Sequence, residues 1–235
     1  MDSTVRSSMD PRDTPAPVPP PVPSGARAAR KREAILEAAR RVFLREGFAA
    51  GVDLLASEAG VSKVTIYNHF GSKENLFRAV IGRTLDDALT DAESVIQARL
   101  AESEDVRADL LEACRTWVAG LTTPDVMALR HLIAGERRRF PGLGSTWQEN
   151  GPARQHAALA AALGRLDERG LLRVPDMDLA VLQLSGLVLS PHLVYGVYGT
   201  ELSPELTDRL IRVGVDVFLR YYGTGEDPSA RPREN

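Results

Sequence analysis

VDLLASEAGVSKVTIYNHFGSKENL, residues 52–76, contains apolar residues at helical spacing on both sides of the pair Gly60-Val61. This pattern predicts short helices over 52–59 and 63–70 with a tight turn between them. Ser62 precedes the second helix, where its hydroxyl can accept a backbone N–H of the first turn. The sequence therefore predicts a helix-turn-helix, with a small core made by Leu55, Ala56, Ala59, Val61 and Ile66.

A helix-turn-helix binds DNA through the first residues of its second helix, which reach base edges in the major groove. Lys63 and Thr65 lie in that first turn. An ammonium group can donate to guanine O6 or N7, and a threonine methyl can touch a thymine methyl. Val64, between them, can make apolar contact only. The same geometry also occurs as plain packing between helices, so DNA binding is the favoured interpretation and packing is the alternative.

The next residues are expected to hold the DNA backbone. Tyr67 and His69 can donate to phosphate oxygens, and Asn68 is included with them among the predicted DNA-binding residues. Lys73 is expected to add a phosphate contact beside the N–H groups of the following helix, which Ser72 can cap. Phe70 is expected in the core. A core position for Tyr67 and a plain surface position for His69 are the alternatives.

Basic residues are concentrated in the front part of the chain. Residues 26–80 contain ten Lys and Arg against six Asp and Glu, whereas residues 81–235 contain seventeen against twenty-three. Arg27 and Lys31, with Arg30 and Arg32, form a basic arm that we expect near the minor groove or the DNA backbone. Such a split suits a protein that meets a polyanion with one end, although uneven surface charge without a partner is the alternative.

The remaining sequence predicts further helices and no convincing pair of strands. They are expected from Arg27 to Gly47, from Ser72 through Leu85 and beyond, from Asp109 to Val118, from a Thr123-Pro124 cap to a stop at Pro141-Gly142, from Pro152 to Arg169, from an Asp176 cap through Leu179 to about Val197, and from Ser203-Pro204 through Tyr221. The predicted fold class is all-α, with an N-terminal three-helix helix-turn-helix domain followed by a larger helical domain.

The chain divides into four predicted regions. Residues 1–25 contain seven of the fifteen prolines and are expected to form a disordered tail. The helix-turn-helix domain is placed at 26–72, the larger helical domain at 73–223 and a second disordered tail at 224–235.

The apolar stretch from Leu179 to Val197 is interrupted by polar residues and a proline, so a membrane span is not expected. A helix that is apolar almost all round must instead be buried, either in a core or against another subunit. We therefore expect no membrane partner.

Nothing in the sequence indicates an enzyme. The four histidines are scattered without metal-ligand spacing, and no phosphate-cradling GxxxxGK[ST] loop is present. We therefore expect no catalytic residues, no metal and no cofactor. The single cysteine, Cys114, cannot form an internal disulfide, which fits a reducing cytoplasm.

The run from Ala59 to Leu76 resembles the signature of the TetR family of repressors, A-G-V-S-K-x-T-L-Y-x-[YH]-F-x-S-K-E-x-L, over some eighteen consecutive positions. The later segments 139–141, 149–152 and 169–172 are similar to the ligand-side domain of AefR-like members. One departure concerns Ala50-Gly51, where the family usually has a Thr/Ser pair that caps the helix and contacts a phosphate. Gly51 caps more weakly, and the hydroxyl contact is lost.

The resemblance implies a repressor that responds to an unknown small-molecule effector and binds a palindromic operator in double-stranded DNA as a homodimer. In this family the last two helices form the dimer interface. Here their contact faces are Leu179 to Val197 and the stripe Leu206, Leu210, Val213, Val217 and Tyr221, with Gly186 and Gly214 allowing close approach. Intramolecular packing alone is the alternative.

The middle helices are expected to surround an effector cavity with apolar walls and a few polar groups. The residues predicted to bind this ligand are Trp117, Met127, His131, Phe140, Trp147 and Tyr195. An ordinary hydrophobic core is the alternative for these residues. A helical DNA-binding protein without an effector, either architectural or paired with another protein, is the alternative for the whole chain.

Overall fold

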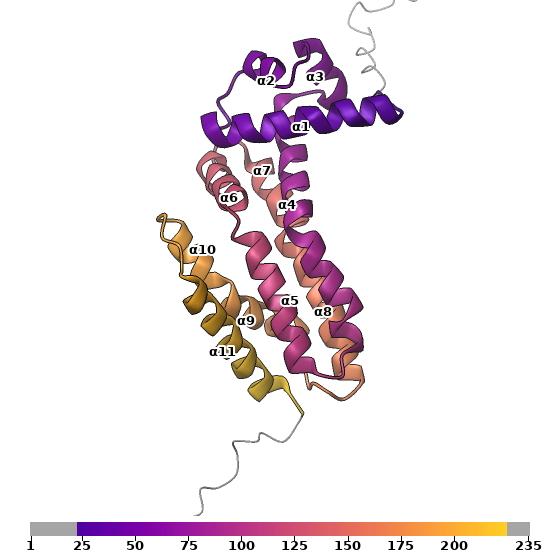
Figure 1. Cartoon of the computed structure of the whole chain (residues 1–235), viewed down its shortest axis with the longest axis vertical. Coiled ribbons are helices and arrows are strands. Elements are labelled where there is room, and N and C mark those ends of the chain that lie inside the picture. The colour runs from indigo at the N-terminus through magenta and orange to yellow at the C-terminus, as the bar shows by residue number, and fades with distance from the viewer. Residues whose placement is uncertain (1–22, 225–235) are drawn as a thin grey trace, which may run out of the picture.

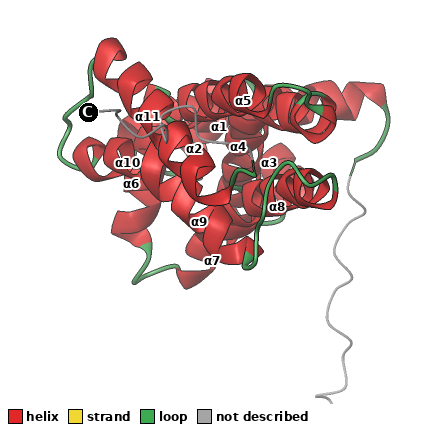
Figure 2. Ribbon diagram, turned by 90° about the horizontal axis from the view of Figure 1, so that it is seen from below, coloured by secondary structure: helices red, strands yellow, loops and turns green. Residues whose placement is uncertain are grey.

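The computed structural model describes residues 23–224, and these residues are built from helices joined by short loops (Figures 1 and 2). Their one pairing of extended backbone is an isolated bridge between Leu172 and Gly223. The all-α prediction is confirmed. The predicted tails lie outside the described residues, except for 23–25 and Thr224.

A small group of helices forms one end of the molecule. It consists of α1 (Ala26–Glu46), α2 (Val52–Glu58) and α3 (Lys63–Phe70), with α1 lying across the end of the long helix α4 (Lys73–Ala98) (Figure 1). The other elements are the short 3-10 helix η1 (Leu100–Glu102), α5 (Val106–Leu121), α6 (Pro124–Glu136), α7 (Pro141–Asn150), α8 (Pro152–Glu168), α9 (Met177–Val188), α10 (Ser190–Gly196) and α11 (Pro204–Tyr222).

Most of the predicted helix starts have the expected side-chain cap. The side chains of Ser62, Ser72, Asp176 and Ser203 each accept the N–H three residues further on, at 3.0–3.2 Å. Thr123 has the expected cap position, but the expected cap hydrogen bond is absent. Thr123 precedes α6, but its hydroxyl donates to the Gly120 carbonyl at 3.2 Å and makes no cap bond.

A first hydrophobic cluster, here called the N-terminal core, fills the space under α1, α2 and α3. Phe77 of α4 packs on Phe43 and Phe48, with ring centroids 4.7 and 5.1 Å apart. The cluster does not end at the predicted domain boundary at residue 72, because it includes the first half of α4 and residues of α6 and α7. The buried members from beyond the boundary are Leu76, Phe77, Val80, Ile81, Leu85, Leu129, Ile133 and Leu143.

A second cluster, the C-terminal core, joins the lower half of α4 to α5, α8, α9 and α11. It contains Trp117, Leu163, Val188 and Phe218, which are all buried. The helices α4 and α5 approach each other so closely that a Cβ at Gly120 would overlap the backbone carbonyl of Ala88. This close approach fixes the crossing of the two helices.

The predicted stop at Pro141-Gly142 is wrong, because Pro141 begins α7. Proline suits the first turn of a helix, where its missing N–H is not needed. The apolar pattern of α7 is too short to predict a helix from sequence. Leu143 is its one buried residue, and Trp147, one turn later, is partly buried and packs against the N-terminal core.

The predicted helix from Leu179 to Val197 is two helices. It breaks at Leu189, and α9 and α10 meet at a bend of 52°. Pro191 accounts for the break, because it lacks the N–H that would continue the helix and its ring clashes with the carbonyl of Leu187.

A helix that crosses a membrane needs about 20 consecutive, mostly apolar residues. No single helix among residues 23–224 is long and apolar enough to cross a membrane. The bent pair of α9 and α10 meets the criteria of length and composition only when the two are taken together.

Candidate functional site

Helix α3 presents one face to solvent and buries the other. Lys63, Val64, Tyr67 and Asn68 are exposed, Val64 by 65% and Tyr67 by 41%. Ile66 and its neighbours at 69 and 70 face the N-terminal core. An exposed valine and tyrosine at the free face of a capped helix are available for contact with another molecule.

The first turn of α3 is fixed by Ser62. Its Oγ accepts the Thr65 N–H at 3.1 Å and lies 2.9 Å from the Thr65 hydroxyl. The cap satisfies one of the N–H groups that a helix start leaves without a partner. Because the Thr65 hydroxyl is engaged with Ser62, its methyl group is the part left for an apolar contact.

Lys63 forms an ion pair with Asp53 of α2, and its Nζ lies 3.2 Å from the Asp53 carboxylate. Both side chains are exposed, by 49% and 82%. A surface pair of this kind contributes about 0–1 kcal/mol, so a phosphate or base can replace the carboxylate at low cost. The pair meanwhile holds the lysine at the exposed end of α3.

A shallow groove joins the start of α1 to α3. It has a volume of about 320 Å³ and is lined by Pro23, Ser24, Arg27, Ala28, Lys31, Thr65, Asn68 and His69. The structure therefore brings two residues of the predicted basic arm, Arg27 and Lys31, beside the predicted DNA-binding residues of α3. The groove combines cationic and polar side chains on a concave surface.

The structure contradicts a surface position for His69 and leaves its imidazole little access to a phosphate. The side chain is only 6% exposed, and its Nδ1 is buried without a hydrogen-bond partner among the described residues. Burial lowers the pKa of His69, and the nearby positive charges of Arg32 and Lys31 lower it further. Arg32 donates to the His69 carbonyl at 3.1 Å and lies over the Phe70 ring. His69 is thus part of the packing between α1 and α3.

The structure gives Lys73 partners other than phosphate. Its Nζ donates to the carbonyls of Phe48 and Ala50 at 3.0 and 3.3 Å and lies 4.6 Å from the centre of the Phe48 ring. Two of its three donors are therefore used within the protein. Lys73 connects the start of α4 to the loop that precedes α2, and the expected phosphate contact has only the third donor left.

This loop carries the departure from the family signature. Gly51 precedes α2 with extended backbone angles and no side chain to cap the helix, while Ala50 is buried. The Gly51 carbonyl accepts the N–H groups of Leu54 and Leu55 at 3.1 and 3.2 Å. The start of α2 is therefore held by backbone bonds and by Lys73 rather than by a hydroxyl.

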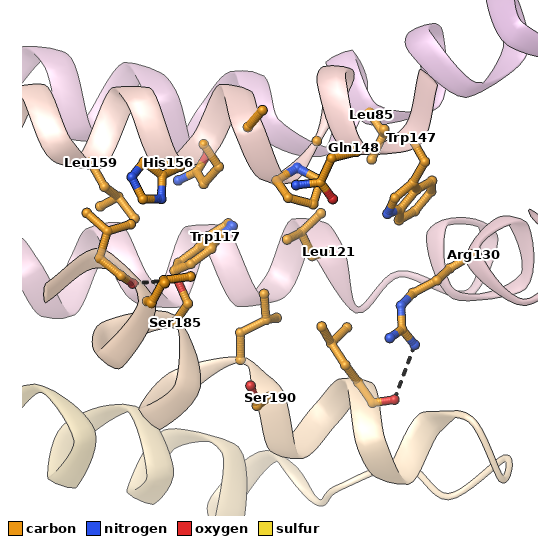
Figure 3. Close-up of a pocket in the computed structure, with 18 of the residues that line it drawn as sticks. Leu85, Trp117, Leu121, Arg130, Trp147, Gln148, His156, Leu159, Ser185 and Ser190 are labelled. Carbon is orange, nitrogen blue, oxygen red and sulfur yellow. Dashed lines mark hydrogen bonds between the residues drawn. The ribbon is translucent and has the colours of Figure 1, made fainter. Parts of the chain in front are cut away.

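A cavity of about 460 Å³ lies in the larger helical part and is lined by residues of α4–α10 (Figure 3). Its polar side chains come from Arg130, Gln148, Gln155, His156, Ser185 and Ser190. Leucine, valine and the two tryptophans of the chain make most of the remaining wall, which gives an apolar chamber of the size that binds small molecules.

The predicted ligand-binding residues divide into three groups. Trp117 and Trp147 line this cavity. Met127 and His131 line a separate pocket of about 350 Å³ between α6 and the end of α10. Phe140 instead packs against Phe48 at 4.5 Å, in contact with the N-terminal core, and Tyr195 is 53% exposed. Their helical spacing could not show which face of each helix would meet the cavity.

Sequence reasoning missed Arg130 and Gln155. Gln155 is 2% exposed and lies one turn before Leu159 on the apolar face of α8. A polar residue in register with an apolar stripe is the signal that could have identified it. Arg130 gave no such signal, because arginine on a helix is usually a solvated side chain.

Helices α9, α10 and α11 share an exposed apolar surface. Val213 and Val217 of the predicted stripe are 53% and 45% exposed. Gly186 is exposed as well, but Gly214 is buried and packs against Leu187 and Val188 of α9, so its close approach lies within the chain. The members of this α9–α11 surface are Leu179, Leu182, Val194, Tyr195, Val197, Tyr198, Val213, Val217 and Tyr221.

Two protein families match this chain. Residues 35–80 match the family described as bacterial regulatory proteins, tetR family, and residues 108–224 match the C-terminal domain of AefR-like transcriptional repressors. The HTH-type transcriptional repressor AcnR of Corynebacterium efficiens is 30% identical over 164 residues, which cover 69% of this chain and 79% of that protein.

Solved structures agree with these matches. A TetR-family regulator from Mesorhizobium loti superposes with a TM-score of 0.80 at 32% identity, covering 85% of this chain and all of that one. The flavonoid-responsive regulator FrrA superposes with a TM-score of 0.68 at 27% identity over 84% of this chain and all of that one.

The helix-turn-helix, the helical body and these relatives together define a DNA-binding transcriptional regulator, a class that is not enzymatic. The chain belongs to the TetR family, and its C-terminal part is of the AefR-like type.

Proposed function

We propose that this protein is a ligand-responsive repressor that binds a palindromic operator as a homodimer in the cytoplasm. Repression is supported by the name of the AcnR relative and by the AefR-like C-terminal domain. Arg27, Lys31, Lys63, Val64, Thr65, Tyr67 and Asn68 are the residues we propose to meet DNA. His69 and Lys73 act in this proposal mainly by holding α3 and the loop before α2.

The observation that carries the proposal is that three helices, α4, α6 and α7, contribute to both the cavity and the N-terminal core. Leu85 of α4 belongs to both. On α6, Val126 and Arg130 line the cavity, while Leu129 and Ile133 belong to the N-terminal core. On α7, Trp147 lines the cavity and Leu143 belongs to that core. A ligand that shifts any of these helices therefore acts directly on the packing under α1–α3.

Two further contacts join the same parts. Arg40 of α1 lies 3.6 Å from Asp125 at the start of α6, and Phe48 packs on Phe140 between α6 and α7. A ligand that prefers an altered arrangement of these contacts must lower DNA affinity, and DNA must lower ligand affinity by the same factor.

The α9–α11 surface supports the homodimer. Apolar residues exposed as a contiguous group on a protein surface commonly mark an interface with another chain. A two-fold dimer would place two copies of α3 in register with two half-sites, about 34–36 Å apart along the DNA.

The experiment is selection of genomic fragments by the purified full chain, followed by footprinting of the bound DNA and light scattering of the free protein. An inverted repeat bound by a dimer supports the proposal. Binding of an asymmetric site by a monomer, or no preference among fragments, would exclude it.

A further inference from the structure

The charge of the 460 Å³ cavity restricts what it can bind. No aspartate or glutamate is among its described lining residues, although the chain as a whole carries a net charge of −3. The one arginine, Arg130, is half-buried, and one of its N–H groups donates to the Leu193 carbonyl at 3.3 Å. No described carboxylate pairs with it. This end of the cavity therefore offers a cation whose remaining donors are free.

The wall of the cavity also holds neutral hydrogen-bonding groups. Trp117 is 4% exposed and Gln155 is 2% exposed. The indole N–H and both amide atoms of Gln155 are buried without a partner among the described residues. Polar atoms buried in this way usually have a partner, and leaving them without one is costly. Figure 3 shows Trp117 and Arg130 on opposite sides of the chamber.

The wall between the two ends is apolar and partly aromatic. Trp117 and Trp147 come from α5 and α7, and most of the other apolar lining residues are leucines. Indole rings contribute large flat contact surfaces and favour an aromatic or otherwise planar body. A ligand with a cationic group would find no negative partner in this wall and would face Arg130.

We propose that the effector is a flat, apolar carboxylic acid with a second hydrogen-bonding group at its far end. The carboxylate pairs with Arg130, and the far group, such as a phenol, bonds to Gln155 and the Trp117 N–H. The inference rests on the proposed function, because it names the class of ligand that would occupy the effector cavity. Arginine matches a carboxylate in geometry as well as charge.

The first test uses calorimetry on the full-length protein without DNA. The probes are a biphenyl carboxylic acid with a hydroxyl at its opposite end, its carboxamide and its methylamine analogue. We expect the acid to bind at least about tenfold more tightly than the amide, as loss of a charge-assisted hydrogen bond predicts, and the amine to bind more weakly than both. Equal binding of acid and amide, or preference for the amine, would overturn the proposal.

Variants of arginine test the acid end. Arg130→Met should remove the preference for acid over amide while leaving the affinity for the amide almost unchanged. Arg138→Met is the matched control, because Arg138 is exposed just beyond α6 and does not line the cavity. Retention of the acid preference by Arg130→Met would contradict the assignment.

Variants at the other end test the far group. Trp117→Phe and Gln155→Leu should each weaken the hydroxylated acid by about five- to tenfold, as loss of one or two buried hydrogen bonds predicts. Neither should weaken the acid that lacks the hydroxyl. Gln155→Leu should also raise the melting temperature, because it removes a buried amide without partners. Equal losses for both acids would show that packing alone is affected and would overturn this part.

The location of binding can be read from intrinsic fluorescence. Trp117 and Trp147 are the two tryptophans of the chain, and both line the cavity. A bound acid should therefore change the emission of Trp117→Phe and of Trp147→Phe alike, whereas an unchanged spectrum on saturation would place the ligand elsewhere. Operator binding is measured separately, so a chain that binds DNA but none of the acids defeats this inference and leaves the repressor proposal standing.

Discussion

At the scale of single residues, the cations around α3 divide by what they touch inside the protein. Among the described residues, Lys63 is held only by an exposed carboxylate, whereas Lys73 bonds to two backbone carbonyls and packs on a phenylalanine ring. A lysine with weak internal partners can move to DNA at little cost, and one with strong partners cannot. The structure therefore separates a residue proposed to read DNA from one that holds the loop before α2.

Lys63→Ala should relax the preference for one base position in each half-site. The expected loss is about 1–3 kcal/mol of discrimination at that position, because one bidentate contact to guanine is removed. Competition binding with operators altered at single positions measures it. Unchanged specificity would remove Lys63 from the residues that read the sequence.

Lys73→Ala should lower the stability of the folded chain. Two hydrogen bonds from a charged, half-buried donor to the loop before α2 are lost, and charged bonds contribute about 1.5–3 kcal/mol before solvent screening reduces the value. Urea unfolding measures the change, with Lys63→Ala as the control that should leave stability nearly unaltered. If Lys73 instead contacts a DNA phosphate, the variant should keep its stability, and the salt slope of DNA binding should fall by about one unit.

At the scale of elements, positions of close contact between helices decide where the long helices cross. Gly120 of α5 meets the Ala88 carbonyl of α4, and Gly214 of α11 meets Leu187 and Val188 of α9. Both glycines lie in helices, where the residue itself is unfavourable. Their small size is therefore needed where α5 crosses α4 and where α11 crosses α9.

Gly120→Ala should destabilise the protein despite the better helix propensity of alanine. The new methyl group would overlap a backbone carbonyl, and the helices must separate, at a cost of about 1–3 kcal/mol. Gly135→Ala is the matched control, because a Cβ at that exposed position of α6 meets nothing within 4 Å. The control should gain up to about 1 kcal/mol. Thermal unfolding that shows equal shifts for both variants would refute the close crossing.

At the scale of the whole molecule, three features share helices. The DNA-binding end contains α1–α3, and α9, α10 and α11 lie together along one side of the rest of the molecule (Figure 1). The cavity is lined by residues of α4–α10. The helices α4, α6 and α7 contribute to both the cavity and the N-terminal core, and α9 and α10 contribute to both the cavity and the α9–α11 surface. Occupancy of the cavity can thus be coupled to the DNA-binding end and to the α9–α11 surface.

Val213→Glu should prevent or weaken self-association and reduce operator binding with it. Val213 lies half-exposed on the α9–α11 surface, and a buried carboxylate at a two-fold interface would meet its own copy or apolar side chains. Light scattering and gel shift measure the two effects. Ala134→Glu, on the exposed face of α6, is the control. A dimer that survives Val213→Glu would place the interface elsewhere.

The sequence by itself determined the helical class, most helix starts and, apart from His69, the exposed residues of α3. These depend on neighbours three or four residues apart, such as Ser62 with Thr65 and Asp176 with Leu179, and this information is local. It also carried the family signature, which the matching relatives confirm. The sequence alone missed α7, where Pro141 begins a helix rather than ending one, and it missed the break that Pro191 makes between α9 and α10.

Only the tertiary structure decided what each side chain does. Phe140 packs against the N-terminal core and Tyr195 lies on the surface, whereas Gln155 and Arg130 line the cavity. Lys73 found its partners 23 and 25 residues earlier in the chain. Periodicity gives the face of a helix but not the element that covers it. The position of a cavity, and the partner of a cation, depend on how distant helices cross.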